Sequence, residues 1–304
     1  MGSQENYEIV TNQIVEALEE VDANSWECPW NQYAHFPRNG ESGRHYNGIN
    51  VFVLWCVGMT NGYETQEWFT YKGAQRLGGH VKKGESGTKI VYWQFPEVAD
   101  LDAAGLTEDE YDELSEDEKD DVPTKTIPVC KTFTVFNRAQ CKELPEPEQQ
   151  DVATDDEIDE FIGSVGADIR RGPMAAYNPK EDKVVLPPRS DFDSTNAYYG
   201  TAIHELAHWT GHEDRLDRDL STRFGDDDYA FEELVAQLTA SFVCADFGVK
   251  SDLQSPEYIK HWIEKMREDK YAVFTASRHA KEAAEFLHEQ AEARQEETVT
   301  DQAA

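Results

Sequence analysis

The 304-residue sequence has little of several features that would assign a chain to a class of protein. Its five cysteines are scattered and never spaced as CxxC, so neither a disulfide framework nor a structural zinc knuckle is expected. No run approaches eighteen apolar residues, and the first residues lack the basic start and apolar core of a signal peptide. We therefore expect no membrane span and a reducing, cytoplasmic location.

Basic residues are also scarce in this sequence. Lysine and arginine together number 28 against 61 acidic residues, which gives a net charge of −33 at pH 7. The acids lie throughout the segments that look folded, so we interpret them as an adaptation to a salt-rich interior, where screening weakens repulsion. The charge predicts a halophilic source. It argues against capture of nucleic acid by the charge of the molecule as a whole.

The apolar content is sufficient for two cores, because 39% of the residues are hydrophobic and 11% are aromatic. We predict an α+β protein with a mixed α/β domain followed by a mostly helical domain with a small β-sheet. The predicted parts are a first domain at 1–145, a linker at 146–156, a second domain at 157–291 and a polar tail at 292–304.

Strand-like runs broken by glycine turns characterise the first domain. The predicted elements are a strand and short helix at 67–79, strands at 82–95 and 130–137, and a buried helix or strand at 48–59. Between the last two strands, twelve acids and one lysine lie between Asp100 and Asp121. We interpret residues 99–124 as a solvated, mobile insertion in a hairpin.

The second domain is predicted to contain a helix, a hairpin and then four helices. The predicted ranges are a helix at 157–167, a hairpin at 173–188, and helices at 194–211, 228–248, 255–269 and 271–293. Ser194 or Thr195 is the expected N-cap of the helix at 194–211, and Gly211 is expected to end it.

The stretch "HELAHWTGHED" at 204–214 is typical of a metal site. His204 and His208 lie four residues apart on one face of the predicted helix, and Glu205 lies between them. This is the H-E-x-x-H arrangement of zinc hydrolases. In such sites the metal lowers the pKa of a bound water and the glutamate takes its proton.

A third ligand is needed, and the residues leave its identity open. Asp214 fits a local H-E-x-x-H-x-x-G-x-x-D pattern, and His212 lies just past the helix end. Glu233, on the following helix, could complete the site from an adjacent element instead. Its neighbour Glu232 points about 100° away and is expected to support the site or to face solvent.

A second group of residues combines positive charge with aromatic rings. Between Trp68 and Phe95 the only acidic residue is Glu85. The basic residues of this window are Lys72, Arg76, Lys82, Lys83 and Lys89; the aromatic ones are Trp68, Phe69, Tyr71, Tyr92, Trp93 and Phe95; upstream lie Arg38, Arg44, His45 and Tyr46. Cations along a backbone with rings that stack on bases are typical of single-strand binding. The alternative is that the rings form a core and the lysines a solvated face.

Long motifs in both domains resemble the ArdC antirestriction family. In the second domain these are "HELAHWTGHEDRLDR" and "FGDDDYAFEELVAQLTASFVCADFGV". In the first domain they are "WECPWNQ", "NGESGRHYNGINVFVLW", "GYETQEWFTYKGAQRLGGHVKKGESGTKIVYW" and "FTVFNRAQC". The resemblance covers nearly the whole chain apart from the acidic insertion and the tail.

The resemblance implies a protein of mobile elements that protects incoming DNA from host restriction. It implies an N-terminal domain that binds single-stranded DNA and a C-terminal zincin-like metallopeptidase domain. Carried over residue by residue, His204, His208 and Glu233 hold the metal, which is Zn²⁺ or another divalent ion such as Mn²⁺, and Glu205 is the catalytic base. The family usually has a small polar residue where this chain has Asp214, which favours Glu233. The chain departs from the family at Gln237, often a glutamate there, and in its acidity.

The resemblance leaves the protein substrate unnamed, although a component of the restriction system is one possibility. In the expected reaction, the strand at Val184–Leu186 borders the substrate cleft and Tyr229 or Tyr199 assists the oxyanion. An alternative function is a non-catalytic single-strand-binding chaperone with a structural metal. A third is a peptidase whose first domain binds protein.

Overall fold

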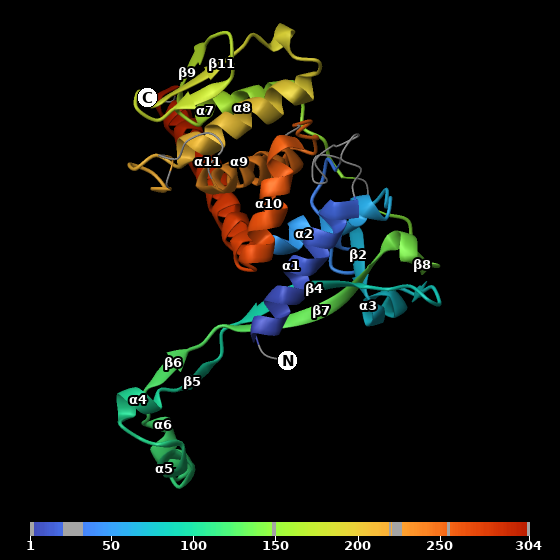
Figure 1. The fold of residues 1–304 in the computed structure, drawn as a ribbon, viewed down its shortest axis with the longest axis vertical. Helices are drawn as coiled ribbons and strands as arrows, with labels where there is room; N and C mark the ends of the chain where they lie inside the picture. Colours follow the sequence, from blue (N-terminus) through green and yellow to red (C-terminus); the bar gives the residue numbers. More distant parts are fainter. Residues whose placement is uncertain are drawn as a thin grey trace.

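The chain folds into two packed halves and a projecting arm, as the computed structural model shows in Figure 1. The structure describes residues 3–20, 33–147, 150–218, 220, 227–253 and 256–302. The motif "WECPWNQ" lies outside these residues. The architecture is α+β, as predicted, with a mixed N-terminal half and a mostly helical C-terminal half.

A four-stranded sheet with the order β1-β2-β7-β4 organises the N-terminal half. Its strands are β1 (Arg38–Asn39), β2 (Glu67–Thr70), β7 (Val129–Asn137) and β4 (Thr88–Gln94). The other elements of this half are α1 (Ser3–Glu20), α2 (Ile49–Thr60), α3 (Tyr71–Arg76), β3 (His80–Val81), β8 (Cys141–Lys142) and the 3₁₀ helix at Arg138–Gln140. All pairs in the four-stranded sheet are antiparallel except β1 with β2.

The apolar run that could have been a helix or a strand forms helix α2. Every residue from Val51 to Cys56 is fully buried. A helix surrounded by the core is apolar on all sides and therefore lacks the usual periodicity. Side-chain amides close the exposed edge of β4: Gln13 exchanges two hydrogen bonds with the backbone of Lys89, and Asn50 does the same with Val91.

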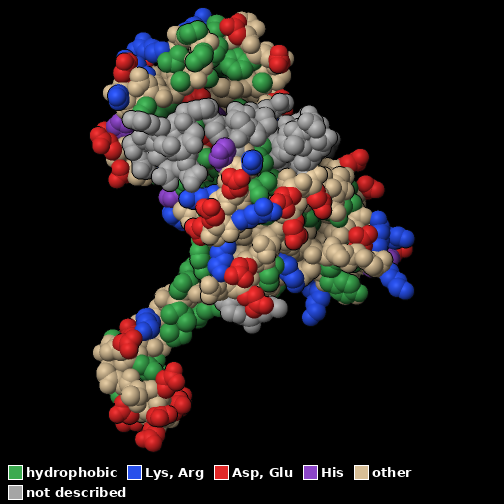
Figure 2. Space-filling model, viewed as in Figure 1, with side chains coloured by type: hydrophobic (Ala, Val, Ile, Leu, Met, Phe, Trp, Pro, Cys, Tyr) green, Lys and Arg blue, Asp and Glu red, His purple; other side chains and the backbone are tan. Residues whose placement is uncertain are grey.

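The acidic insertion extends the hairpin of β4 and β7 as a solvent-exposed arm with secondary structure of its own. It forms a two-stranded ladder, β5 (Glu97–Ala99) with β6 (Thr124–Thr126), and the short helices α4 (Leu101–Ala104), α5 (Glu108–Asp112) and α6 (Glu116–Asp120). Capping boxes at Thr107 and Ser115 begin two of these helices. No helix of the arm contains a buried residue, and acidic side chains gather at its tip (Figure 2).

The C-terminal half packs a three-stranded sheet against helices. The sheet has the order β10-β11-β9, with β9 (Asp168–Arg171), β10 (Ala176–Asn178) and β11 (Lys183–Leu186). The helices are α7 (Asp155–Ser164), the 3₁₀ helix Arg189–Asp191, α8 (Thr195–Thr210), α9 (Asp227–Asp246), α10 (Pro256–Glu268) and α11 (Ala272–Gln302). Ser194 is the N-cap of α8. Helix α11 continues to Gln302, through residues expected to form a polar tail.

One hydrophobic core runs through both halves. Helix α1 packs against α10, and α11 packs against α2. The Thr11 hydroxyl donates a hydrogen bond to the Lys270 carbonyl at 2.8 Å, and the Tyr7 ring contacts the rings of Tyr271 and Phe274. Within the part of the chain that the structure describes, no helix is long and apolar enough to cross a membrane.

Candidate functional site

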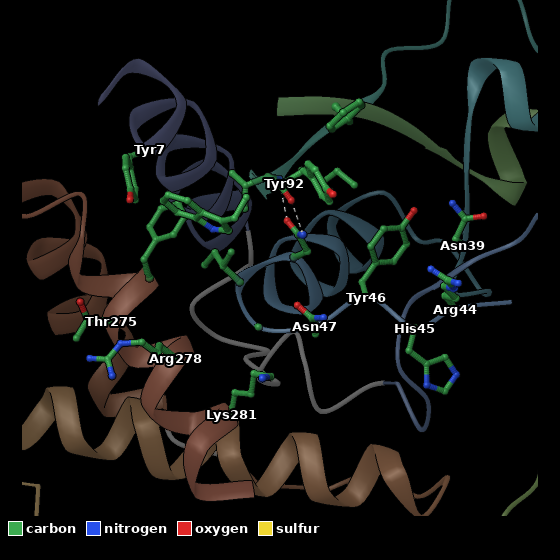
Figure 3. Close-up of a pocket in the computed structure, with 18 of the residues that line it drawn as sticks. Tyr7, Asn39, Arg44, His45, Tyr46, Asn47, Tyr92, Thr275, Arg278 and Lys281 are labelled. Atoms are coloured by element: carbon green, nitrogen blue, oxygen red, sulfur yellow. Dashed lines mark hydrogen bonds between the residues drawn. The ribbon is translucent and has the colours of Figure 1, made fainter. Parts of the chain in front are cut away.

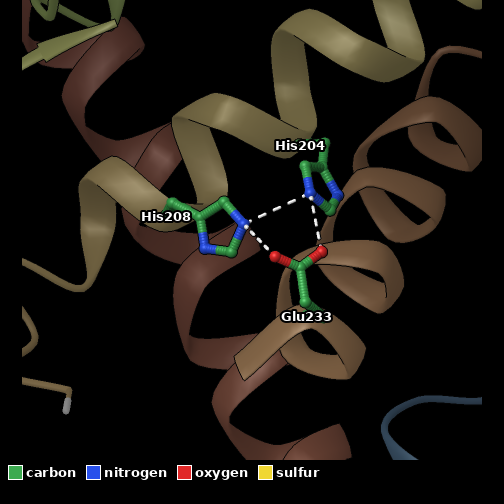
Figure 4. A group of neighbouring side chains, drawn as sticks. All are labelled: His204, His208 and Glu233. Atoms are coloured by element: carbon green, nitrogen blue, oxygen red, sulfur yellow. Dashed lines mark hydrogen bonds and ion pairs between the residues drawn. The ribbon is translucent and has the colours of Figure 1, made fainter. Parts of the chain in front are cut away.

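Helices α8 and α9 bring together three side chains that could hold a metal ion (Figure 4). The Nε2 atoms of His204 and His208 are 3.2 Å apart, and the Glu233 carboxylate lies 3.4 Å from the first and 3.5 Å from the second. A tetrahedral ion about 2.0–2.2 Å from each ligand would separate ligand atoms by roughly 3.4 Å. The three residues therefore fit a divalent metal ion. Among the described residues, these three form the group of histidine and acidic side chains that could hold a metal ion.

Glu232 fixes the orientation of His208. Its carboxylate lies 3.2 Å from Nδ1 of His208, and because a carboxylate only accepts, this nitrogen carries the hydrogen. Nε2 of His208 is then directed at the cluster. Carboxylates that orient a metal-binding histidine in this way also raise its basicity.

A buried arginine holds Glu232 in turn. The Arg218 guanidinium is 5% exposed and donates to both carboxylate oxygens of Glu232, at 3.0 and 2.9 Å. It also donates to the Thr210 hydroxyl and to the Ala207 carbonyl. Arg218 thereby links the segment after α8 to Glu232 on α9, beside the three candidate ligands.

The surroundings of Glu232 and Glu233 favour the charged form of both carboxylates. Burial alone would lower the pKa of His208, but hydrogen bonds and charge from Glu232 and Glu233 raise it to about 10. Burial opposes ionisation of Glu233, yet its two histidine partners hold its pKa well below the ordinary value. Burial likewise opposes ionisation of Glu232, whose pKa is lowered by His208 and Arg218. A cation at the cluster faces concentrated negative charge.

Glu205 lies on α8 beside the ligands and is 9% exposed. It is three residues before His208, so the two side chains project from adjacent faces of the helix. The role of Glu205 as a base stays a prediction from the H-E-x-x-H pattern.

The local candidates for a third ligand lie elsewhere. The Asp214 side chain is 84% exposed and lies 3.5 Å from Nδ1 of His212, the other local candidate. The prediction that Tyr199 assists an oxyanion is wrong, because Tyr199 is fully buried and its hydroxyl donates to the Asp155 carbonyl at 3.0 Å. Tyr229 lies one turn before Glu233 on α9.

The strand at Val184–Leu186 is not an edge strand, so it cannot pair with a substrate strand as predicted. It belongs to β11, the central strand of its sheet, and both of its edges are paired, with β10 and with β9. Val184 is fully buried and Leu186 is 3% exposed. A substrate strand could only pair with an edge strand, and β10 is the edge strand that contacts α8.

Two of the predicted DNA-binding residues lie in the core. Trp68 is fully buried against Leu54 and Val135, so it is not available to stack on a base. The Arg38 side chain is 10% exposed and pairs with buried Glu67 at 2.6 Å. Trp68 therefore belongs to the core, as in the alternative interpretation of the aromatic residues.

A basic hollow lies at the far end of the N-terminal half, where Lys and Arg side chains project near α3 and β8 (Figure 2). Its volume is about 580 Å³, and its lining includes Tyr71, Lys82, Lys83 and Lys142. Tyr71 is 52% exposed. Nearby on α3, Lys72 is exposed and Arg76 forms a bidentate ion pair with Glu41.

A larger cleft of about 990 Å³ lies between the N-terminal half and helix α11 (Figure 3). The predicted residues Arg44 and Tyr46 line it. Lys89 lies outside it, partly buried, with its ammonium group 2.7 Å from the Thr134 hydroxyl. The predicted cationic and aromatic residues are therefore divided between two surfaces and the core.

Sequence reasoning missed the contribution of the C-terminal half to this cleft. Tyr271, Phe274, Arg278 and Lys281 line it, although they belong to the zincin-like half. The role of Arg218 behind the metal cluster was missed as well. In each case the contacting residues are distant in the sequence, so no local spacing of residues predicts the contact.

Comparison with known proteins gives a consistent assignment for both halves. Residues 4–136 match the N-terminal domain of the anti-restriction factor ArdC, and residues 156–279 match a zincin-like metallopeptidase family. The chain is similar to the metal-free structure of the antirestriction ArdC protein from plasmid R388, with 37% identity and a TM-score of 0.73. That match covers 94% of this chain and 98% of the other. The Mn(II)-bound structure of the same protein gives a TM-score of 0.69 over 94% and 97% of the two chains.

Relatives known from their sequences include proteins of two kinds. The uncharacterized protein y4eC of Sinorhizobium fredii is 35% identical over 293 residues, which cover 93% of this chain and 92% of the relative. The DNA primase TraC of Escherichia coli is 34% identical over 300 residues, 92% of this chain. The chain spans only 20% of the length of that primase.

Proposed function

Since this chain belongs to the ArdC antirestriction family, we propose that it protects the DNA of a mobile element from host restriction. Its N-terminal half binds single-stranded DNA in this proposal, and its zincin-like half carries a metal-dependent peptidase site. The observation that supports the proposal is the pairing of a complete His–His–Glu cluster with a basic, aromatic surface in one chain.

The proposed metal ligands are His204, His208 and Glu233. This donor set is typical of catalytic zinc, and the Mn(II)-bound relative makes Mn²⁺ the other candidate. A divalent ion bound there supplies a Lewis acid and a water of lowered pKa. Three protein ligands leave a coordination position for substrate, as catalytic sites require.

The chain's own residues have distinct proposed roles in peptide hydrolysis. Glu205 takes a proton from the attacking water and delivers it to the leaving amine. Glu232 and Arg218 hold His208 in place, so the cluster does not have to reorganise during the reaction. Tyr229, one turn before Glu233, is the remaining candidate for an oxyanion partner.

The proposed substrate is a protein that limits entry of the DNA, such as a component of the restriction system. The proposed setting is the cytoplasm of a halophilic cell, because the net charge of −33 suits a salt-rich interior. We propose domain limits near 1–145 and 157–291. The DNA-binding set is proposed to retain Arg44, Tyr46, Tyr71, Lys72, Arg76, Lys82, Lys83 and Lys89.

A DNA-transfer assay tests the enzymatic part of this proposal. Recipients that contain a restriction system receive unmodified DNA together with wild-type protein, Glu205→Ala or Glu233→Gln. Loss of protection with both variants supports a peptidase. Full protection by Glu205→Ala would instead identify a non-catalytic DNA chaperone with a structural metal.

Titration of a fluorescent oligonucleotide at several salt concentrations tests the DNA-binding part. Binding to phosphate weakens with salt, whereas base stacking is much less sensitive. A chain this acidic is expected to rely on close contacts and stacking, and therefore to show a weaker salt dependence than a basic relative. Absence of binding at every salt concentration would exclude this part of the proposal.

A further inference from the structure

We propose that single-stranded DNA occupies the cleft between the two halves, and that the zincin-like half supplies part of its binding site. This inference rests on the proposed single-strand binding and assigns its location. The cleft is lined by α1, the segment before α2, strand β4 and helix α11. In Figure 3, Arg44 and His45 lie at one side of it, and Arg278 and Lys281 extend from α11 at another.

The charge of the cleft is the first argument. Acidic residues number 61 of 304 in the chain, yet none of the described residues that line the cleft is acidic. The lining includes Arg44, Arg278 and Lys281. A cationic concavity in so acidic a molecule attracts a polyanion locally, since screening confines the effect of the distant acids.

The aromatic rings are the second argument. Five aromatic side chains are strongly exposed in the described part of the chain, and four of them line this cleft. They are Tyr92 (52% exposed), Phe95 (64%), Phe133 (46%) and Tyr271 (42%). Exposed rings beside cations provide stacking surfaces for bases. A duplex keeps its base faces stacked on one another, so this combination favours a single strand.

The arginine and lysine side chains of α11 can reach phosphate. Arg278 pairs with Glu282 and Lys281 with Glu285, each four residues along the exposed face of the helix. Exposed pairs of this kind are weak, and a phosphate can replace the carboxylate as partner. The ion pairs therefore do not commit these cations to a structural role.

Aromatic contacts join the cleft walls of the two halves. The Tyr7 ring packs edge-on against Tyr271 and Phe274, with centroids 4.7 and 4.6 Å apart, and lies tilted against Trp93 at 5.6 Å. This cluster joins α1 and β4 to the start of α11. The N-terminus of α2, from Gly48 to Asn50, also lines the cleft.

Binding of a fluorescent oligo-dT to the full chain tests the inference. The variant Arg278→Gln/Lys281→Gln is expected to weaken binding about tenfold and to lower the salt slope by about 1.4, because two phosphate contacts are lost. The matched control is Arg170→Gln/Lys260→Gln, which removes the same charge from two exposed ion pairs outside the cleft. It is expected to bind like wild type, and melting curves check that both variants are folded.

A third variant distinguishes the cleft from the basic hollow. If Lys82→Gln/Lys83→Gln weakens binding while Arg278→Gln/Lys281→Gln does not, the strand contacts the hollow alone and the inference is wrong, although single-strand binding stands. If wild type binds no oligo-dT, both proposals fail. Tighter binding of oligo-rU than of oligo-dT would overturn the assignment to DNA.

Photo-cross-linking gives an independent position for the strand. An oligonucleotide that contains bromodeoxyuridine is expected to form adducts with Tyr92 of the N-terminal half and Tyr271 of the zincin-like half. Adducts on Tyr71 alone would place the bases in the basic hollow and contradict the inference.

Discussion

The cluster of His204, His208 and Glu233 and the cleft between the two halves are organised in opposite ways. The cluster consists of three nearly buried side chains from two helices, and the buried pair of Glu232 and Arg218 holds His208 in place. The cleft collects exposed rings and cations from segments between Tyr7 and Lys281. A buried cluster of this kind depends on every member, whereas a surface distributes its free energy over many weak contacts. Substitutions should therefore act all-or-none at the cluster and in small steps at the cleft.

The strongest test of this contrast is a substitution of Glu233, the proposed third metal ligand. Glu233→Gln preserves the size of the side chain but removes the charge that faces His204 and His208. Metal affinity should fall by more than the 10- to 100-fold expected for an outer partner of a ligand. Calorimetric titration with Zn²⁺ and with Mn²⁺ measures the effect.

Asp214→Asn is the matched control for that experiment. It also neutralises one acid, but at an exposed position outside the cluster. Metal affinity should stay within about twofold of wild type, as for a surface substitution. If Asp214→Asn abolishes binding and Glu233→Gln does not, the ligand set is wrong.

The second test concerns the ion pair behind the cluster. Glu232→Gln leaves the Arg218 guanidinium, which is 5% exposed, without its charged partner. Breaking a buried pair from one side costs about 3–5 kcal/mol in the free energy of unfolding. Metal affinity should also fall about 10- to 100-fold, because His208 loses the carboxylate that orients it. Urea denaturation and metal titration measure the two effects.

Glu282→Gln is the comparison at the cleft, since Glu282 pairs with Arg278 on the exposed face of α11. The free energy of unfolding should change by less than about 0.5 kcal/mol. A loss as large as that of Glu232→Gln would contradict the distinction between buried and exposed pairs.

The contrast also explains which features could be predicted from the sequence. The spacing of His204 and His208 on one helix face is local information, and it is sufficient to predict that the two imidazoles lie together. Glu233 lies on another helix, and the residues alone left open whether it, Asp214 or His212 is the third ligand. The rings near Trp68 show the limit: burial depends on packing against Leu54 and Val135, and a pattern of aromatic residues does not separate core from surface.

The fold shows the same division. The helices and hairpin of the C-terminal half follow from caps and periodicity, as at Ser194. The acidic composition of residues 99–124 predicted a solvated insertion in a hairpin but did not predict the short helices there, which begin at capping boxes at Thr107 and Ser115. Gln13 and Asn50 form hydrogen bonds with the edge of β4 from distant parts of the chain. These contacts could not be predicted from local sequence.

The third test probes a single ring of the cleft. Tyr92→Ala removes an exposed stacking surface that packs edge-on against Phe133, with centroids 5.8 Å apart. Stacking contributes about 1–3 kcal/mol per base, so binding of oligo-dT should weaken by roughly tenfold with an unchanged salt slope. Tyr111→Ala, which removes a ring from the arm, should have no effect on binding. A changed salt slope for Tyr92→Ala would indicate a role other than stacking.

The smallest effect is expected from removal of the arm. The Ile127 backbone N–H donates to the Pro96 carbonyl at 3.1 Å, so the chain can be closed there by an Asn-Gly turn in place of residues 97–126. Since no helix of the arm has a buried residue, stability and metal affinity should be unchanged. The deletion removes thirteen acids and two lysines, so binding of oligo-dT should strengthen slightly at low salt and not at high salt. A marked weakening instead would make the arm part of the DNA site and would extend that site beyond the cleft.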